Sequence, residues 1–151
     1  MQTSDIVAII SLMISVGAFF FAKSSAQAAS RQNEISLHHK RLKIYQGVSK
    51  YGLKLIVHGL SVAETDIWTF DDWVQLSEFY FCKKVFKRLD PLPKKSLEML
   101  GLNQDQNDGS QSGSQSALER NREQKKILHE IRDEIQAIRD IMKETLRVDG
   151  G

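Results

Sequence analysis

Residues 6–22 read IVAIISLMISVGAFFFA, and the interpretation of the whole chain starts from them. This run contains no charged residue and no proline, and only two serines and one glycine interrupt its apolar side chains. A helix of this length spans roughly 25 Å, and an extension back to Thr3 brings it to about 30 Å, the thickness of the hydrocarbon core of a bilayer. The run therefore predicts a single transmembrane helix.

A cleaved signal peptide is the competing interpretation of the same run. Residues 26–28, Ala-Gln-Ala, have the A-x-A form of a cleavage site. A signal peptide also needs a positively charged segment before its apolar run. Residues 1–5 contain only one charged side chain, the acidic Asp5. We therefore expect an uncleaved anchor that is preceded by a short tail, residues 1–5.

The charges after the anchor predict its orientation. Residues 23–60 contain seven Lys or Arg side chains and one acid. Because Lys and Arg resist translocation, the tail is expected outside the cytoplasm and everything after the anchor inside it. Lys23 and Arg31 could also attract anionic lipid headgroups. Lys50 lies roughly 40 Å beyond the anchor along a straight helix, so we interpret most of this charge as a solvated face.

Residues 23–102 are predicted to form one helical cytoplasmic domain. The anchor helix is expected to continue to Gly59, although Gly47 and Gly52 each weaken it by about 1 kcal/mol relative to Ala and could bend it. Residues 61–82 then carry five acids and no Lys or Arg. A second helix is expected to begin near Ser61 or Glu64, or at a second possible cap, Thr69. It should pack antiparallel to the basic helix.

Apolar side chains of this domain predict its core. In the acidic segment, Ile67, Phe70, Val74 and Phe81 share one helical stripe, and Trp73, Leu76 and Tyr80 lie beside it. The next segment offers a short apolar face before Pro91 and Pro93 interrupt the helix. Cys82, the only cysteine, excludes an intrachain disulfide and is expected to be a small core residue.

A disordered linker is predicted over residues 103–116, and a coiled-coil helix follows over residues 117–148. The linker, NQDQNDGSQSGSQS, has no large apolar side chain. The helix has a 3-4-3-4 apolar spacing, which predicts an oligomer interface. Glu134 and Arg139 fall where an interchain salt bridge would form. Self-association, a heterologous partner helix and packing within the chain all remain open for this apolar seam, which consists of Leu128, Ile131, Ile135, Ile138 and Met142.

The anchor carries a second association signal. Small residues recur along it at spacings of three and four, and such residues allow helices in lipid to approach closely. Lipid-facing filler is the alternative interpretation, because alanine and serine are common residues. The residues predicted for transmembrane packing are Ser11, Ser15, Ala18 and Ala22.

The sequence contains no recognisable motif for catalysis or for binding a cofactor or metal. It contains no phosphate-binding glycine loop, no HExxH motif and no nucleophile elbow. His38 and His39 point about 100° apart on a helix and do not form a metal pair. We expect no enzymatic activity, no cofactor, no metal, no small-molecule substrate and no nucleic-acid partner.

The order of these segments resembles small bacterial single-span membrane proteins of unassigned function. The similarity covers residues 6–100 and rests on the anchor, on RLKIYQGVSKYG at residues 41–52 and on EFYFCKKVFKRLD at residues 78–90. The two prolines and the appended coiled coil depart from that pattern. The resemblance implies a bacterial protein with an anchor and a helical cytoplasmic domain. Together with the charge bias after the anchor, it leads us to expect a single-pass protein of the inner membrane, with its amino terminus outside and its carboxyl terminus in the cytoplasm.

Two functional classes follow from these predictions. The first is a non-enzymatic membrane-anchored scaffold, adaptor or regulatory subunit that forms a homo-oligomer and binds a cytoplasmic protein. The alternative is a small toxin-like or defence effector whose assembled anchors perturb the bilayer. An ionisable residue inside the membrane is the usual mark of an ion pathway. The anchor contains none, and this favours the first class.

Overall fold

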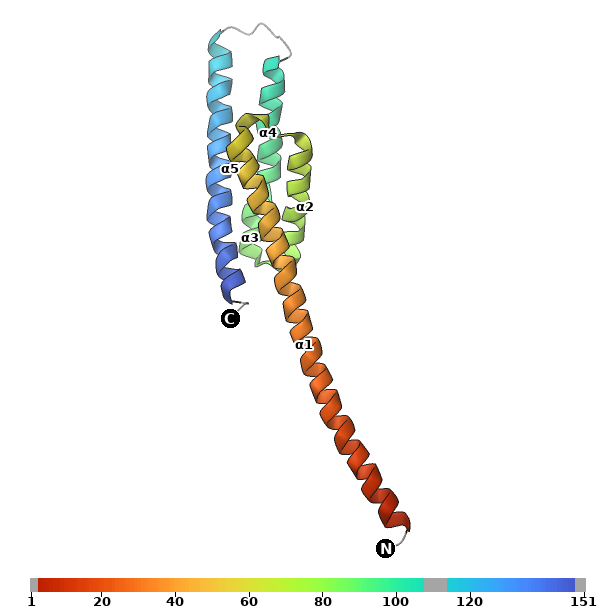
Figure 1. Ribbon diagram of the computed structural model, residues 1–151. Coiled ribbons are helices and arrows are strands. Elements are labelled where there is room, and N and C mark those ends of the chain that lie inside the picture. Colours follow the sequence, from red (N-terminus) through yellow and green to blue (C-terminus); the bar gives the residue numbers. More distant parts are fainter. Residues whose placement is uncertain (1–2, 108–113, 149–151) are drawn as a thin grey trace. The chain divides into compact units, whose positions relative to one another are not determined.

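The computed structural model describes residues 3–107 and 114–148, and every element in these ranges is helical (Figure 1). Side chains are described for residues 11–101 and 118–147. The chain divides into two compact units, residues 1–37 and 38–151. The all-α class is confirmed, with the elements α1 (Thr3–His58), η1 (Gly59–Ser61), α2 (Glu64–Tyr80), α3 (Lys83–Leu89), α4 (Pro91–Asn107) and α5 (Ser114–Val148).

Helix α1 begins in the first unit and ends in the second. It ends at His58, and Gly59 follows with φ of +56°. A left-handed backbone of this kind is strained for residues that carry a Cβ, so glycine is the usual residue just past a helix end. The predicted helix end at Gly59 is therefore confirmed.

The remaining helices of the second unit follow their local stop signals. Helix α2 begins at Glu64, as one of the alternatives predicted. Thr69 lies inside α2, where its hydroxyl donates to the Thr65 carbonyl at 2.8 Å, so its predicted role as a cap is wrong. Pro91 is the first residue of α4, a position where its missing N–H costs no hydrogen bond.

The boundaries of the predicted linker differ from the structure. Helix α4 continues to Asn107 and α5 begins at Ser114, so residues 103–107 and 114–116 are helical. Residues 108–113, the middle of the predicted linker, lie outside the described residues. The sequence suggested disorder because this segment lacks apolar side chains. Neither residues 103–107 nor residues 114–116 contain a glycine or proline, so no helix breaker stops α4 or α5 at that compositional boundary.

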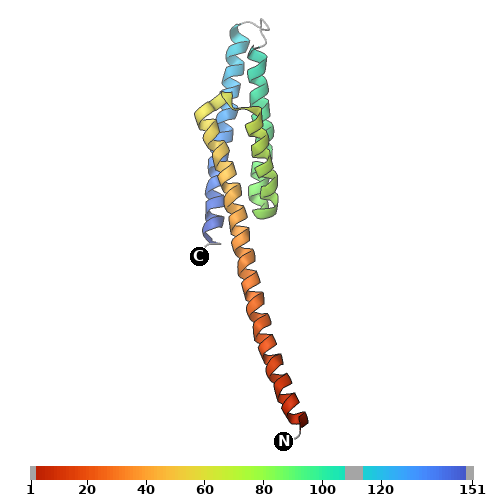
Figure 2. The same ribbon diagram turned by 45° about the vertical axis from the view of Figure 1, so that its right-hand side comes forward.

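Side chains from α1 to α5 build one core in the second unit. Helices α4 and α5 lie side by side in two views (Figures 1 and 2). The four stripe residues predicted in the acidic segment are buried, whereas Leu76 is exposed. Cys82 is exposed as well, which contradicts its predicted place in the core. The largest fully buried apolar side chains are Ile44, Leu55, Ile67, Phe70, Leu89, Leu92, Met99, Ile131, Ile135, Ile138 and Met142.

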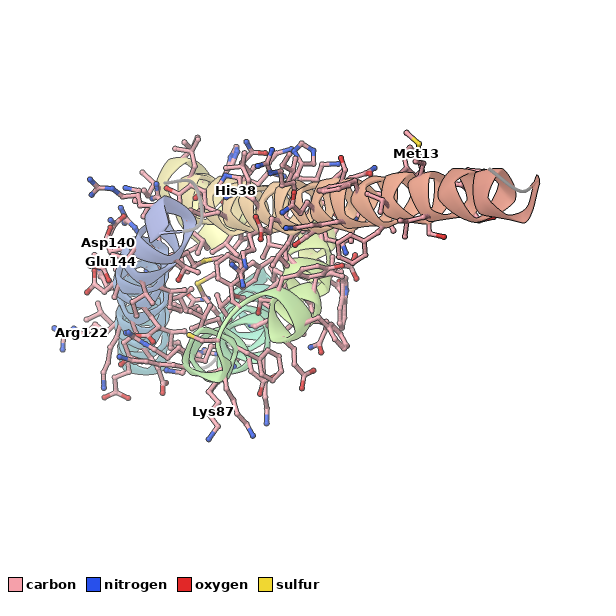
Figure 3. The ribbon with its side chains drawn as sticks, turned by 90° about the horizontal axis from the view of Figure 1, so that it is seen from below. Met13, His38, Lys87, Arg122, Asp140 and Glu144 are labelled. Atoms are coloured by element: carbon pink, nitrogen blue, oxygen red, sulfur yellow. The ribbon has the colours of Figure 1, made fainter. Side chains whose placement is uncertain are left out.

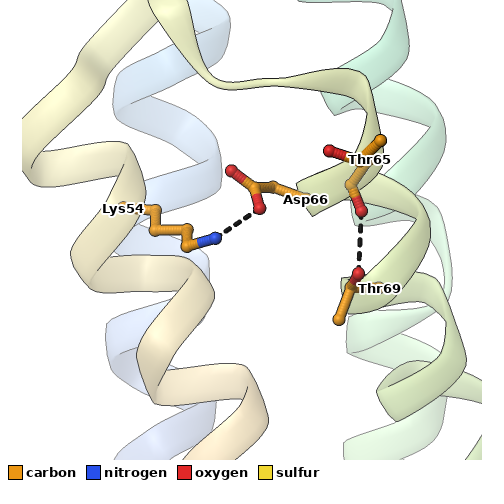
Figure 4. A network of polar contacts seen from close by, with 4 residues as sticks. All are labelled: Lys54, Thr65, Asp66 and Thr69. Atoms are coloured by element: carbon orange, nitrogen blue, oxygen red, sulfur yellow. Dashed lines mark hydrogen bonds and ion pairs between the residues drawn. The ribbon is translucent and has the colours of Figure 1, made fainter.

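The end of α1 packs antiparallel to α2, as predicted. The Arg41 Nε donates to the Tyr80 carbonyl at 2.6 Å, whereas farther along α1 the Lys54 ammonium pairs with Asp66 (Figure 4). Between these contacts, the rings of Tyr51 and Phe70 stack with centroids 4.1 Å apart and 8° between their planes. The pairing joins the basic helix to the acidic one, and the stacked rings of Tyr51 and Phe70 are buried between the two polar contacts.

Candidate functional site

The apolar run at the start of α1 is exposed along its described length. Every side chain from residue 11 to residue 30 is exposed, and Phe21 retains 77 % of its surface. Met13 points away from the helix (Figure 3). Among the described residues, α1 is the one helix long and apolar enough to cross a membrane, by length and composition.

The small residues predicted to pack in the membrane are also exposed. The Ser15 hydroxyl donates to the Ser11 carbonyl at 2.8 Å, so this hydroxyl needs no partner from outside its own helix. Ala18 and Ala22 lie exposed farther along. Their role in helix association stays a prediction.

The apolar seam of α5 is buried within the chain itself. Leu128 retains 8 % of its surface, and Ile131, Ile135, Ile138 and Met142 retain at most 1 %. These side chains belong to the same core as residues of α1 to α4. The structure thus favours packing within the chain over the oligomer interface that we predicted. A second chain is not needed to cover this seam.

The charged residues that flank the seam also find partners in their own chain. Arg88 on α3 binds Glu134 with two hydrogen bonds, Nε to Oε1 at 2.5 Å and Nη2 to Oε2 at 2.8 Å. These bonds lower the pKa of the Glu134 carboxyl below its usual value, against a smaller opposing effect of burial. Lys95 on α4 pairs with Glu130 at 3.2 Å. We predicted an interchain salt bridge between Glu134 and Arg139, but in the structure Glu134 pairs with Arg88 of its own chain.

A groove of about 410 Å³ lies between α1 and α2 and was not predicted. One wall carries three lysines of α1, and the other carries the side chains of Asp66, Thr69 and Trp73. Lys54 pairs with Asp66 at one end. The full lining consists of Lys43, Gln46, Gly47, Lys50, Tyr51, Lys54, Asp66, Thr69, Phe70 and Trp73.

Gly47 gives the groove its shape. A Cβ at this position would lie 2.6 Å from three carbons of the Trp73 indole, so only glycine lets the ring lie against α1. Gly52 has the same role toward α5, because a Cβ there would lie 2.9 Å from the Ile135 Cγ2. Both glycines, which the sequence marked as weak points of the helix, are therefore sites of close packing.

Tyr51 connects the groove to the core and predicts how stability depends on pH. Its side chain is 3 % exposed, and burial raises its pKa to about 12 from 10.0. Because the folded state holds this proton more tightly, the stabilisation is complete below pH 10 and is lost as the pH rises toward 12. The loss should approach about 3 kcal/mol. Tyr51→Phe should remove this dependence, as measured by urea unfolding at pH 9 and 11.5. An equal decline in both proteins would contradict it.

No family model, curated protein or solved structure matches the chain. Within the residues that the structure describes, no group of three or more His, Cys, Asp or Glu side chains could hold a metal ion. The arrangement instead offers two surfaces for binding: the exposed apolar run at the start of α1, and the groove between α1 and α2 with its three lysines. Sequence reasoning found the first by composition. It missed the second because the lysines were interpreted as a solvated face. The signal in the sequence was the spacing of Lys43, Gly47, Lys50 and Lys54, which lie three or four residues apart and therefore share one side of a helix.

Proposed function

We propose that this chain is a non-enzymatic membrane-anchored adaptor, scaffold or regulatory subunit that self-associates and binds a cytoplasmic protein. The observation that carries the proposal is the exposed apolar run of α1. Exposed apolar patches of this length are rare on monomeric soluble proteins. A bilayer would remove these side chains from water, at roughly 25 cal/mol per Å² of apolar surface.

The second unit supports the adaptor role through its own exposed apolar side chains. Trp68 and Phe79 lie eleven residues apart on α2, which places them on one face of the helix, and Phe79 retains 78 % of its surface. Leu76 is exposed close to that face. Aromatic side chains in this position are typical anchors of protein interfaces. Self-association, in this proposal, uses the small residues of the anchor, because the α5 seam is already covered.

Cell fractionation tests the anchor and its orientation. The full chain should stay in the inner-membrane fraction after carbonate and high-salt washes, whereas residues 23–151 alone should be soluble. A reporter active only in the cytoplasm should function when fused after Gly151, and a reporter active only outside should not. The charge bias after residue 22 is the reason for this expectation.

Three results would contradict the proposal. A mature protein that lacks residues 1–28 would establish a cleaved signal peptide. Activity of the external reporter alone would reverse the orientation. Loss of membrane potential on induced expression, followed with a potential-sensitive dye, would favour the bilayer-perturbing effector instead.

A further inference from the structure

We propose that the groove between α1 and α2 binds a small phosphate-bearing anion through Lys43 and Lys50. The proposal goes beyond the adaptor function and does not depend on it. Its basis is the charge, the shape and the lining of the groove.

The lysines of the groove share one face of α1. Residues 43, 50 and 54 fall within about 40° of one another at 100° per residue. Lys50 and Lys54 are four residues apart, a spacing at which like charges destabilise a helix. The three ammonium groups therefore concentrate positive charge on the side of α1 that lines the groove.

The opposite wall leaves two of these charges uncompensated. Asp66 is the one carboxylate among the residues that line the groove, and it pairs with Lys54. In the part of the chain that the structure describes, neither Lys43 nor Lys50 forms an ion pair. Glu64 and Asp71 of α2 do not line the groove, and each accepts a hydrogen bond within α2 itself, Glu64 from the Trp68 indole at 3.1 Å and Asp71 from Gln75 at 3.4 Å. The groove therefore carries a net charge of about +2.

A concave surface strengthens the attraction between these lysines and an anion. Charges of one sign in a cleft with low-dielectric walls focus the electric field and raise the local concentration of counter-ions. Trp73 and Phe70 form such a wall here, and the Gln46 amide adds a hydrogen-bond donor. A volume of about 410 Å³ suits a small ligand. Ammonium groups bind phosphate oxygens with charge-assisted hydrogen bonds, so a ligand with two phosphates fits both lysines.

Fluorescence of Trp73 can report the binding directly. The chain contains two tryptophans, and Trp68 does not line the groove. In a Trp68→Phe background, the full chain in neutral detergent is titrated with inorganic pyrophosphate at 0.15 M ionic strength. We expect a saturable change with a Kd below about 1 mM. Lys43→Gln and Lys50→Gln should each raise the Kd at least about tenfold.

A matched pair of controls separates the site from general electrostatics. Lys84→Gln and Lys87→Gln remove the same charges from exposed positions of α3, where Lys87 points outward (Figure 3), and should leave the Kd within about twofold. Lys50→Arg should retain binding. Equal weakening by both pairs, or no saturation up to 10 mM pyrophosphate, would overturn the proposal.

A second arm identifies the source of the phosphate. The same titration is repeated in nanodiscs of neutral lipid and in nanodiscs that contain an anionic phospholipid. Unchanged binding in both assigns the groove to a soluble phosphorylated ligand. A Kd for pyrophosphate that rises only in the nanodiscs with anionic phospholipid assigns the same lysines to a phospholipid headgroup, and Lys84→Gln and Lys87→Gln should leave that rise unchanged. Either result supports phosphate binding in the groove, whereas a rise that Lys84→Gln or Lys87→Gln abolishes places the lipid contact on α3 and contradicts it.

Discussion

Ile135→Asp is expected to unfold the second unit rather than to dissociate an oligomer. Ile135 retains 1 % of its surface, and its Cγ2 lies where a Cβ on Gly52 would come within 2.9 Å, so it packs directly against α1. An unpaired carboxylate at this point costs about 3–5 kcal/mol, which is a large part of the stability of a small domain. The full chain in detergent should lose its cooperative thermal transition and its near-ultraviolet tryptophan circular dichroism.

A matched variant isolates the effect of burial. His129→Asp adds an acid to an exposed position of the same helix and should change the free energy of unfolding by no more than about 0.5 kcal/mol. Sedimentation of both variants shows which assembly is affected. If Ile135→Asp yields folded monomers from a larger wild-type assembly, the seam of α5 is an interface between chains, and the packing described above is not the state in solution.

The sequence predicted the faces of the helices better than their partners. The spacing of Leu128, Ile131 and Ile135 indicates that one side of α5 must be covered, because apolar periodicity reports burial. It does not report what covers that side. A seam of about three heptads fits a second chain and a neighbouring helix equally well. The deciding contact, between Ile135 and Gly52, joins residues far apart in the sequence, where local patterns carry no information.

Charge patterns had the same limit. The acidic segment was expected to pack against the basic helix, and Lys54 does pair with Asp66. Glu134 also fits a heptad position next to a partner chain, but in the structure Arg88 of α3 donates a hydrogen bond to it within the same chain. Ion pairs this exposed contribute only about 0.2–1 kcal/mol, so they adjust to the packing rather than determine it.

The two glycines of α1 show why the groove escaped prediction. In isolation, glycine inside a helix indicates weakness or a bend, because it lacks a side chain and loses more backbone entropy on folding. The structure shows a different reason for both positions: each removes a Cβ where a neighbouring helix approaches closely. The ring against Gly47 belongs to Trp73, which periodicity placed beside the core stripe without indicating which helix it would face.

Gly47→Ala should therefore destabilise the second unit, although alanine is the better helix former. The new methyl group would lie 2.6 Å from Cγ, Cδ1 and Cδ2 of Trp73, atoms of a rigid ring that cannot bend away. Forcing extra volume into such a contact costs typically 1–3 kcal/mol. The gain in helix propensity, about 1 kcal/mol, offsets only part of that cost. The expected net loss in urea unfolding is up to about 2 kcal/mol, with a shift in Trp73 emission in the Trp68→Phe background.

Alanine substitutions at two other glycines serve as controls for Gly47→Ala, because the space around each glycine differs. A Cβ on Gly101 in α4 would meet no atom within 4 Å, so Gly101→Ala should be neutral or stabilise the unit by up to about 1 kcal/mol. Gly52→Ala, at 2.9 Å from one methyl group of Ile135, should fall between the two. Equal stabilisation by all three substitutions would mean that α1 does not approach α2 and α5 this closely. The groove would then lack the wall that Trp73 gives it, and the anion-binding proposal would lose its geometric basis.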